Sequence, residues 1–268
     1  MNAPNRGPRA FARYVAIGDS FTEGLSDADP EHANRYVGWA DRLAAHLALS
    51  AGEHNHDFGY ANLAVRGRLL SNIVGRQLED AISLQPDLVS LVGGGNDILR
   101  PKADIDALAT RLEEAVGRLR ATGADVLMAT PTDPRDAPLV KATRGRAAIY
   151  TAHIWSIARR HDAYVIDLWG MAALRDWRLW APDRIHLTPE GHRRVALNAF
   201  STLGFSAGDA SWSVPLPPAP SISRSDAARA NAQWAREYVG PWVRRRLRGQ
   251  SSGDTVSAKR PALTPIED

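Results

Sequence analysis

Tyr14-Val15-Ala16-Ile17-Gly18-Asp19-Ser20 forms an apolar run that ends in a polar turn. Apolar residues without polar alternation are typical of a strand covered on both faces, and such strands belong to parallel sheets. Four further runs have the same character, although Asn62 interrupts the second strand of the series. The five expected strands cover residues 14–17, 60–64, 88–92, 125–130 and 163–168.

Stretches with helical periodicity separate these strands. In residues 104–122 the apolar positions Ile105, Leu108, Leu112 and Leu119 recur at helical spacing, and Gly123 follows as a stop signal. Three further helices are expected over residues 38–49, 142–160 and 189–200, the last with Thr188 as its N-cap. Strands that alternate with helices predict a doubly wound α/β sheet of five parallel strands.

The composition limits the classes of function. The chain has 268 residues, of which 44% are hydrophobic, so it can bury a full core. It has no cysteine, which excludes disulfides and thiolate metal sites and fits a cytoplasmic protein. A net charge of +3 is too small to indicate nucleic-acid binding. No stretch resembles a secretion signal or a membrane span, and we expect neither a metal nor another cofactor.

The composition also changes along the chain. We expect an N-terminal arm over residues 1–13, the α/β domain over 14–208, a proline-rich linker and helix over 209–249, and a disordered tail over 250–268. Trp234 and Tyr238 lie on one face of the C-terminal helix and predict that it docks on the α/β domain. The alternative is a mobile basic arm, in which Arg244-Arg245-Arg246 contacts a membrane surface or a partner.

Polar side chains follow two of the expected strands. Ser20 comes directly after the first and Asn96 directly after the third, so both are expected at the carboxyl edge of the sheet, where ligands bind in this architecture. A serine hydroxyl needs a base to become a nucleophile, and His186 is the candidate. Asp183, three residues earlier, would orient the imidazole. Asn96, Gly67 and the Ser20 backbone N–H are the candidate donors to a developing oxyanion.

Four segments match one known family in the same order. Gly18-Asp19-Ser20, Gly67, Gly94-Gly95-Asn96-Asp97 and Asp183-Arg184-Ile185-His186 resemble the four blocks of the SGNH (GDSL-type) hydrolases. The resemblance spans about residues 14–200 and departs from the commonest pattern only at Phe21. It implies a flavodoxin-like three-layer α/β/α fold and hydrolysis of esters, thioesters or acetylated sugars. It also implies that Ser20, Asp183 and His186 form a triad with Gly67 and Asn96 in the oxyanion hole.

Each segment alone has a simpler explanation, because Gly-Asp-Ser and Gly-Gly-Gly-Asn-Asp are common turn sequences. Their joint occurrence at the expected strand ends favours catalysis. Further candidates for contact with a small-molecule substrate are Arg66, Arg100 and Trp180. The two arginines are equally compatible with a surface role, and Trp180 is equally compatible with a place in the core. An acyltransferase with the same triad and a non-catalytic binding module stay as alternatives, and the sequence leaves the oligomeric state open.

Overall fold

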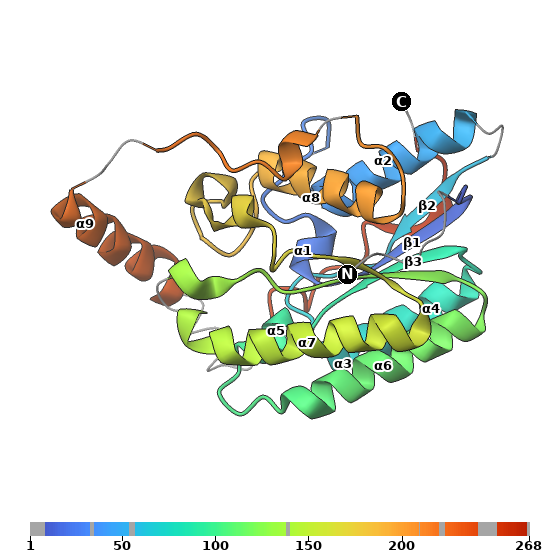
Figure 1. Cartoon of the computed structure of the whole chain (residues 1–268), viewed down its shortest axis with the longest axis horizontal. Helices are drawn as coiled ribbons and strands as arrows, with labels where there is room; N and C mark the ends of the chain where they lie inside the picture. Colours follow the sequence, from blue (N-terminus) through green and yellow to red (C-terminus); the bar gives the residue numbers. More distant parts are fainter. Residues whose placement is uncertain are drawn as a thin grey trace.

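The computed structural model describes residues 9–32, 35–53, 57–137, 140–208, 210–219, 223–240 and 251–266. Its strands form one sheet in the order β5-β4-β3-β1-β2-β6 (Figure 1). The first five strands are parallel, and their order is that of flavodoxin, which confirms the predicted fold class. The strands are β1 (Arg13–Gly18), β2 (Gly59–Asn62), β3 (Leu88–Val92), β4 (Asp125–Ala129), β5 (Tyr164–Ile166) and β6 (Arg260–Thr264).

Helices cover both faces of the sheet (Figure 1). One face carries α2 (Gly38–Glu53) and α8 (Pro189–Thr202), and the other carries α3 (Leu70–Asn72), α4 (Leu78–Ser83), α6 (Ile105–Ala121) and α7 (Arg144–His161). The remaining α-helices are α1 (Ser20–Glu23), α5 (Gly95–Ile98) and α9 (Arg224–Trp234). Short 3₁₀ or π turns cover Ile73–Gln77, Pro134–Asp136, Val140–Thr143, Ala172–Arg175, Trp177–Leu179, Ala210–Trp212 and Ala235–Val239.

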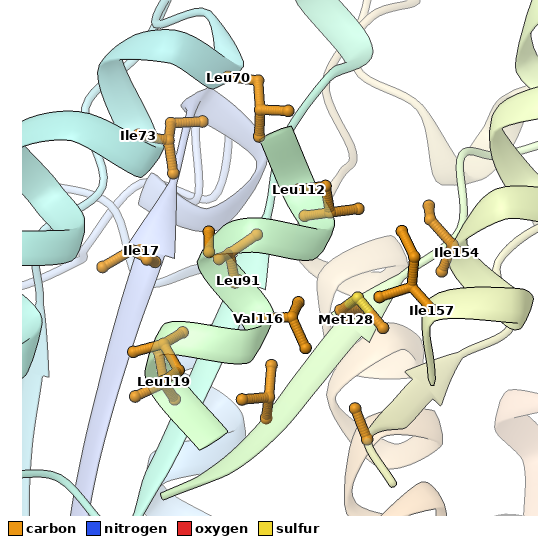
Figure 2. Packing of buried hydrophobic residues seen from close by; sticks show 14 of the residues in the cluster. Ile17, Leu70, Ile73, Leu91, Leu112, Val116, Leu119, Met128, Ile154 and Ile157 are labelled. Carbon is orange, nitrogen blue, oxygen red and sulfur yellow. The ribbon is translucent and has the colours of Figure 1, made fainter. Parts of the chain in front are cut away.

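The core has two halves, one on each side of the sheet. Successive side chains of β1 alternate between them, with Val15 and Ile17 facing α6 and α7, and Tyr14 and Ala16 facing α2 and α8. Figure 2 shows the first half, in which residues of α6 pack over Ile17 and its neighbours on β3 and β4. The prediction that these strands are covered on both faces is therefore confirmed.

Helix starts in the structure rest on real caps. The Thr188 hydroxyl accepts a hydrogen bond from the Gly191 N–H at 3.3 Å, as predicted. At the start of α9, the Ser223 hydroxyl accepts one from the Asp226 N–H at 3.1 Å. None of the helices in the described ranges has both the length and the apolar composition that crossing a membrane requires. The basic segment around Arg244-Arg245-Arg246 lies outside the described residues.

The expectation of a disordered tail is wrong for residues 251–266, which we call the C-terminal strap. Within it, β6 pairs antiparallel with β2 and adds a sixth strand to the predicted five. Without β6, the outer edge of β2 would present unpaired backbone groups, and the strap supplies partners for them. Pro261 is compatible with this position because β6 is itself an edge strand.

One lysine anchors the strap. The Lys259 ammonium donates to the backbone carbonyls of Glu23, Tyr36 and Val37, at 2.6 to 2.9 Å, and to the Asp41 carboxylate. These acceptors belong to α1, to the loop after it and to α2. The strap therefore connects the end of the chain to the segment that directly follows Ser20.

Candidate active site

Ser20, His186 and Asp183 form a continuous chain of hydrogen-bonding groups at the carboxyl edge of the sheet. The Ser20 Oγ lies 3.0 Å from Nε2 of His186, and Nδ1 of His186 lies 2.6 Å from Oδ2 of Asp183. The structure thus brings together residues 166 positions apart in the sequence. Hydroxyl, imidazole and carboxylate stand in the order that activates a serine nucleophile.

The loop that carries His186 is short and internally bonded. The Ala181 N–H donates to the His186 carbonyl at 2.8 Å, and the Asp183 Oδ1 accepts the Ile185 and His186 N–H groups at 2.9 and 3.0 Å. Arg184 adopts a left-handed backbone conformation with φ of 57°, which lets the chain turn between Asp183 and His186. Asp183 therefore organises the loop as well as the imidazole.

The electrostatics of Asp183 suit this role. Burial opposes its ionisation, but the hydrogen bonds and charge of His186, together with the Ile185 N–H, outweigh burial, so the pKa of Asp183 lies below its usual value. The side chain is consequently a carboxylate at neutral pH. An ionised carboxylate beside Nδ1 favours the tautomer that leaves Nε2 free to accept the serine proton.

The turn at Ser20 is held from several sides. Asp19 is the N-cap of α1 and accepts the Phe21 N–H at 3.1 Å. A Cβ on Gly18 would lie 2.8 Å from the Val92 carbonyl oxygen, so only glycine fits there. The buried Gln77 amide bonds both the N–H and the carbonyl of Gly18, at 2.8 and 3.0 Å. Gln77 could not be found from the sequence, because a glutamine within a helical stretch has no local mark of this role.

The candidate oxyanion donors gather beside Ser20. The Asn96 amide donates to the Arg68 carbonyl at 3.0 Å and to Oδ2 of Asp19 at 3.2 Å, so Asn96 joins the turn after β2 to the turn after β1. Gly67 has a φ of 71° and lies in the turn after β2. Within the described residues, neither the Gly67 N–H nor the Ser20 N–H donates to any acceptor. Of these two residues, Ser20 lines the pocket at this edge of the sheet and Gly67 does not.

Asp19 has an unusual protonation behaviour. Burial raises its pKa to about 6, although the Phe21 N–H and the nearby His186 act in the opposite direction. The Asn96 amide therefore donates to a carboxyl whose ionisation burial opposes.

A pocket opens beside Ser20 and His186, with a volume of about 340 Å³. Ser20 and His186 lie in its wall together with Asn96, and most of the remaining wall is apolar. The apolar lining comes from the turns after β1, β3 and β4, from α7, from the histidine loop and the segment before it, and from the end of α9 and the π turn after it. It includes Phe21, Leu25, Val92, Ile98, Leu99, Ala129, Pro131, Pro134, Ala137, Val140, Ala147, Leu168, Leu174, Trp177, Trp180, Ile185 and Leu187.

The three candidate substrate-contacting residues have different positions. Trp180 lines the pocket, and its indole N–H donates to the Leu174 carbonyl at 2.7 Å. Arg66 forms an ion pair with the buried Glu23 and stacks on Tyr36, so it lies outside the pocket wall. Arg100 is exposed and also lies outside that wall.

Segments beyond the α/β layers also reach the site. The indole N–H of Trp234, in α9, donates to the Asp183 carbonyl at 2.8 Å, in agreement with the predicted docking of this helix. On the opposite side, the Ser251 hydroxyl in the strap donates to the Gly67 carbonyl at 3.2 Å. No local pattern around Ser251 indicates this contact. The structure thus places both C-terminal segments against loops that carry candidate catalytic residues.

Comparisons with known proteins agree with this geometry. The model of the GDSL-like Lipase/Acylhydrolase family matches residues 16–194. No curated protein matches the chain. Among solved structures, LAE5, an alpha/beta hydrolase enzyme from the metagenome of Lake Arreo, is 24% identical with a TM-score of 0.60, over 72% of this chain and 95% of its own.

Two other solved structures have similar scores. Axe2, an acetylxylan esterase from Geobacillus stearothermophilus, is 20% identical with a TM-score of 0.60, over 77% of this chain and 98% of its own. TesA is 21% identical with a TM-score of 0.57, over 71% of this chain and 97% of its own. At these identities the likeness establishes the fold alone.

Proposed function

Because this chain belongs to the GDSL-like lipase/acylhydrolase family and is an ester hydrolase, we propose that it cleaves carboxylic esters through an acyl-enzyme on Ser20. The observation that carries the proposal is the hydrogen-bonded series from Ser20 through His186 to Asp183, placed at the wall of an apolar pocket. The substrate is a small molecule with an ester, thioester or O-acetyl group.

In the first half of the reaction, the Ser20 hydroxyl gives its proton to Nε2 of His186 while Oγ bonds to the acyl carbon. The acyl oxygen becomes an oxyanion, and the N–H groups of Ser20 and Gly67 and the Asn96 amide donate to it. The bond to the alcohol then breaks, and the imidazolium gives its proton to the departing oxygen. Asp183 stabilises the imidazolium throughout.

In the second half, water takes the place of the alcohol. His186 removes a proton from the water as its oxygen bonds to the acyl carbon. The bond between that carbon and the Ser20 oxygen breaks, and the serine recovers its proton from the imidazolium. The carboxylic acid leaves, and the enzyme returns to its starting state. Every step uses side chains and backbone groups of this chain.

The role of Ser20 is tested by covalent labelling together with mutation. A fluorophosphonate should label the wild-type protein, and peptide mapping should locate the label on Ser20. Ser20→Ala should be unlabelled and inactive on p-nitrophenyl esters while keeping its circular dichroism spectrum. Ser211, outside the pocket wall, supplies the matched control, and Ser211→Ala should be labelled normally. Hydrolysis that survives in Ser20→Ala would refute the proposal.

A further inference from the structure

α9 touches the loop that carries two members of the proposed triad. Besides the bond from the Trp234 indole to the Asp183 carbonyl, the Arg184 guanidinium donates to the Asn231 side-chain oxygen at 2.6 Å. The two contacts reach Asp183 and Arg184, the first two residues of the segment that ends at His186. The helix therefore has a fixed position against this loop through two polar contacts one turn apart.

Aromatic rings close the same side of the pocket. The guanidinium carbon of Arg184 lies 5.6 Å from the ring centre of Trp177 and 5.0 Å from that of Trp234. Arg184 thus lies between two indoles, an arrangement that cation–π attraction favours. This stack joins α9 to the 3₁₀ turn Trp177–Leu179, which belongs to the α/β domain.

Two aromatic residues, one at the end of α9 and one in the π turn Ala235–Val239, belong to the pocket wall. Trp234 and Tyr238 are half-buried, four residues apart, and both line the pocket. The exposed residues of α9 are mainly polar or alanine, as in the stretch Ala228-Arg229-Ala230-Asn231. The family match ends at residue 194, before α9 begins, so this part of the wall is an addition of the present chain to the shared core.

The size and polarity of the pocket indicate what it holds. Its volume of about 340 Å³ lies in the range of sites that hold a small organic ligand, and its wall is mostly apolar. An acetyl group would leave most of this apolar space unfilled. A linear acyl chain would occupy more of it and bury its methylenes against apolar wall residues such as Val92, Leu168 and Trp234.

We infer that α9 and the π turn Ala235–Val239 make this protein selective for acyl chains longer than acetyl, with Trp234 and Tyr238 as the outer wall of the acyl pocket. The inference rests on the proposed function, in which the acyl group is bound to Ser20. Trp234 has a second, positioning role, because its N–H holds the Asp183 carbonyl.

The test is the kcat/KM of p-nitrophenyl esters from acetyl to dodecanoyl. In the wild type, each added methylene that is buried should raise kcat/KM about fourfold up to the pocket limit, the factor that corresponds to about 0.8 kcal/mol. Trp234→Ala and Tyr238→Ala should each lower the octanoyl-to-acetyl ratio about tenfold or more. Gln233 lies on the exposed side of α9, and Gln233→Ala should leave the ratio unchanged.

Trp234→Phe separates packing from positioning. It keeps a ring in the wall but loses the N–H, so it should retain most of the octanoyl-to-acetyl ratio while lowering kcat on all esters by a similar factor. Trp234→Ala and Tyr238→Ala could leave the octanoyl-to-acetyl ratio unchanged while their acetyl-ester activity still depends on Ser20. That result would overturn this inference alone. Hydrolysis that does not depend on Ser20 would instead overturn the proposed function and the inference with it.

Discussion

Lys259 Nζ lies 2.6 Å from Oδ2 of Asp41, a pair formed across 218 positions of the sequence. The two side chains are 12% and 18% exposed, so the ion pair is largely removed from water. Burial raises the pKa of Asp41 to about 6, even though the Lys259 charge lowers it. This ion pair thus ties the strap to α2. Removing either residue would leave the other buried without its partner.

Lys259→Met should therefore lower the free energy of unfolding by about 3 kcal/mol, because it leaves the Asp41 carboxylate and three backbone carbonyls without their donor. Urea unfolding followed by circular dichroism measures this change. Lys102 is exposed, and Lys102→Met should change the stability by less than about 0.5 kcal/mol. The double variant Asp41→Asn with Lys259→Met should recover part of the loss. Equal stability of Lys259→Met and wild type would contradict an anchoring role.

Asn96→Ala should lower kcat by about 10²–10³, the usual effect of losing one donor to an oxyanion, with little change in KM. Steady-state kinetics on the preferred p-nitrophenyl ester measure both constants. Asn72 on α3 is exposed, and Asn72→Ala serves as the control with an unchanged kcat. If KM increased while kcat stayed constant, Asn96 would be a substrate-binding residue and no oxyanion donor.

Ser20→Ala, His186→Ala and the double variant should have nearly equal residual rates, because the two residues act as a unit and their effects are not additive. Measured rates should be compared with that of the uncatalysed reaction under the same conditions. Asp183→Asn keeps the shape of the side chain but loses the carboxylate, and should reduce kcat less than either single change. If the rate loss of the double variant equalled the product of the two single losses, the residues would act independently.

His192 should make the stability depend on pH. It is 1% exposed, and burial lowers its pKa to about 4 from the ordinary value of 6.5. Below pH 6.5 the unfolded chain takes up a proton that the folded state resists, so this contribution to stability is present above pH 6.5 and is lost as the pH falls toward 4. The loss should reach about 3 kcal/mol at pH 4.

Urea unfolding of the wild type and His192→Gln between pH 4 and 7 tests this dependence. The stability difference between the two proteins should shift in favour of the variant as the pH falls. His32 is exposed, and His32→Gln should follow the wild type closely. A difference that stays constant across the range would mean that His192 is not the group responsible.

The parallel strands could be predicted from local pattern because most of them are nearly continuous apolar runs. The run from Leu88 to Val92 is apolar along its whole length, and in the structure it is β3 with the predicted bounds. The candidate triad could be predicted for a related reason. Ser20 and Asn96 follow strands that run in the same direction, and parallel strands bring their carboxyl ends to one edge.

The sequence by itself thus determined the α/β architecture and the edge of the sheet that carries Ser20 and Asn96. Only the tertiary structure decided that Arg260–Thr264 becomes a strand, that Gln77 holds Gly18, and that Trp234 lies against the Asp183 loop. The physical reason is the source of the stabilising partner. An apolar run favours burial through its own side chains. An edge strand, a buried amide and a docked indole instead depend on partners that distant segments of the chain supply.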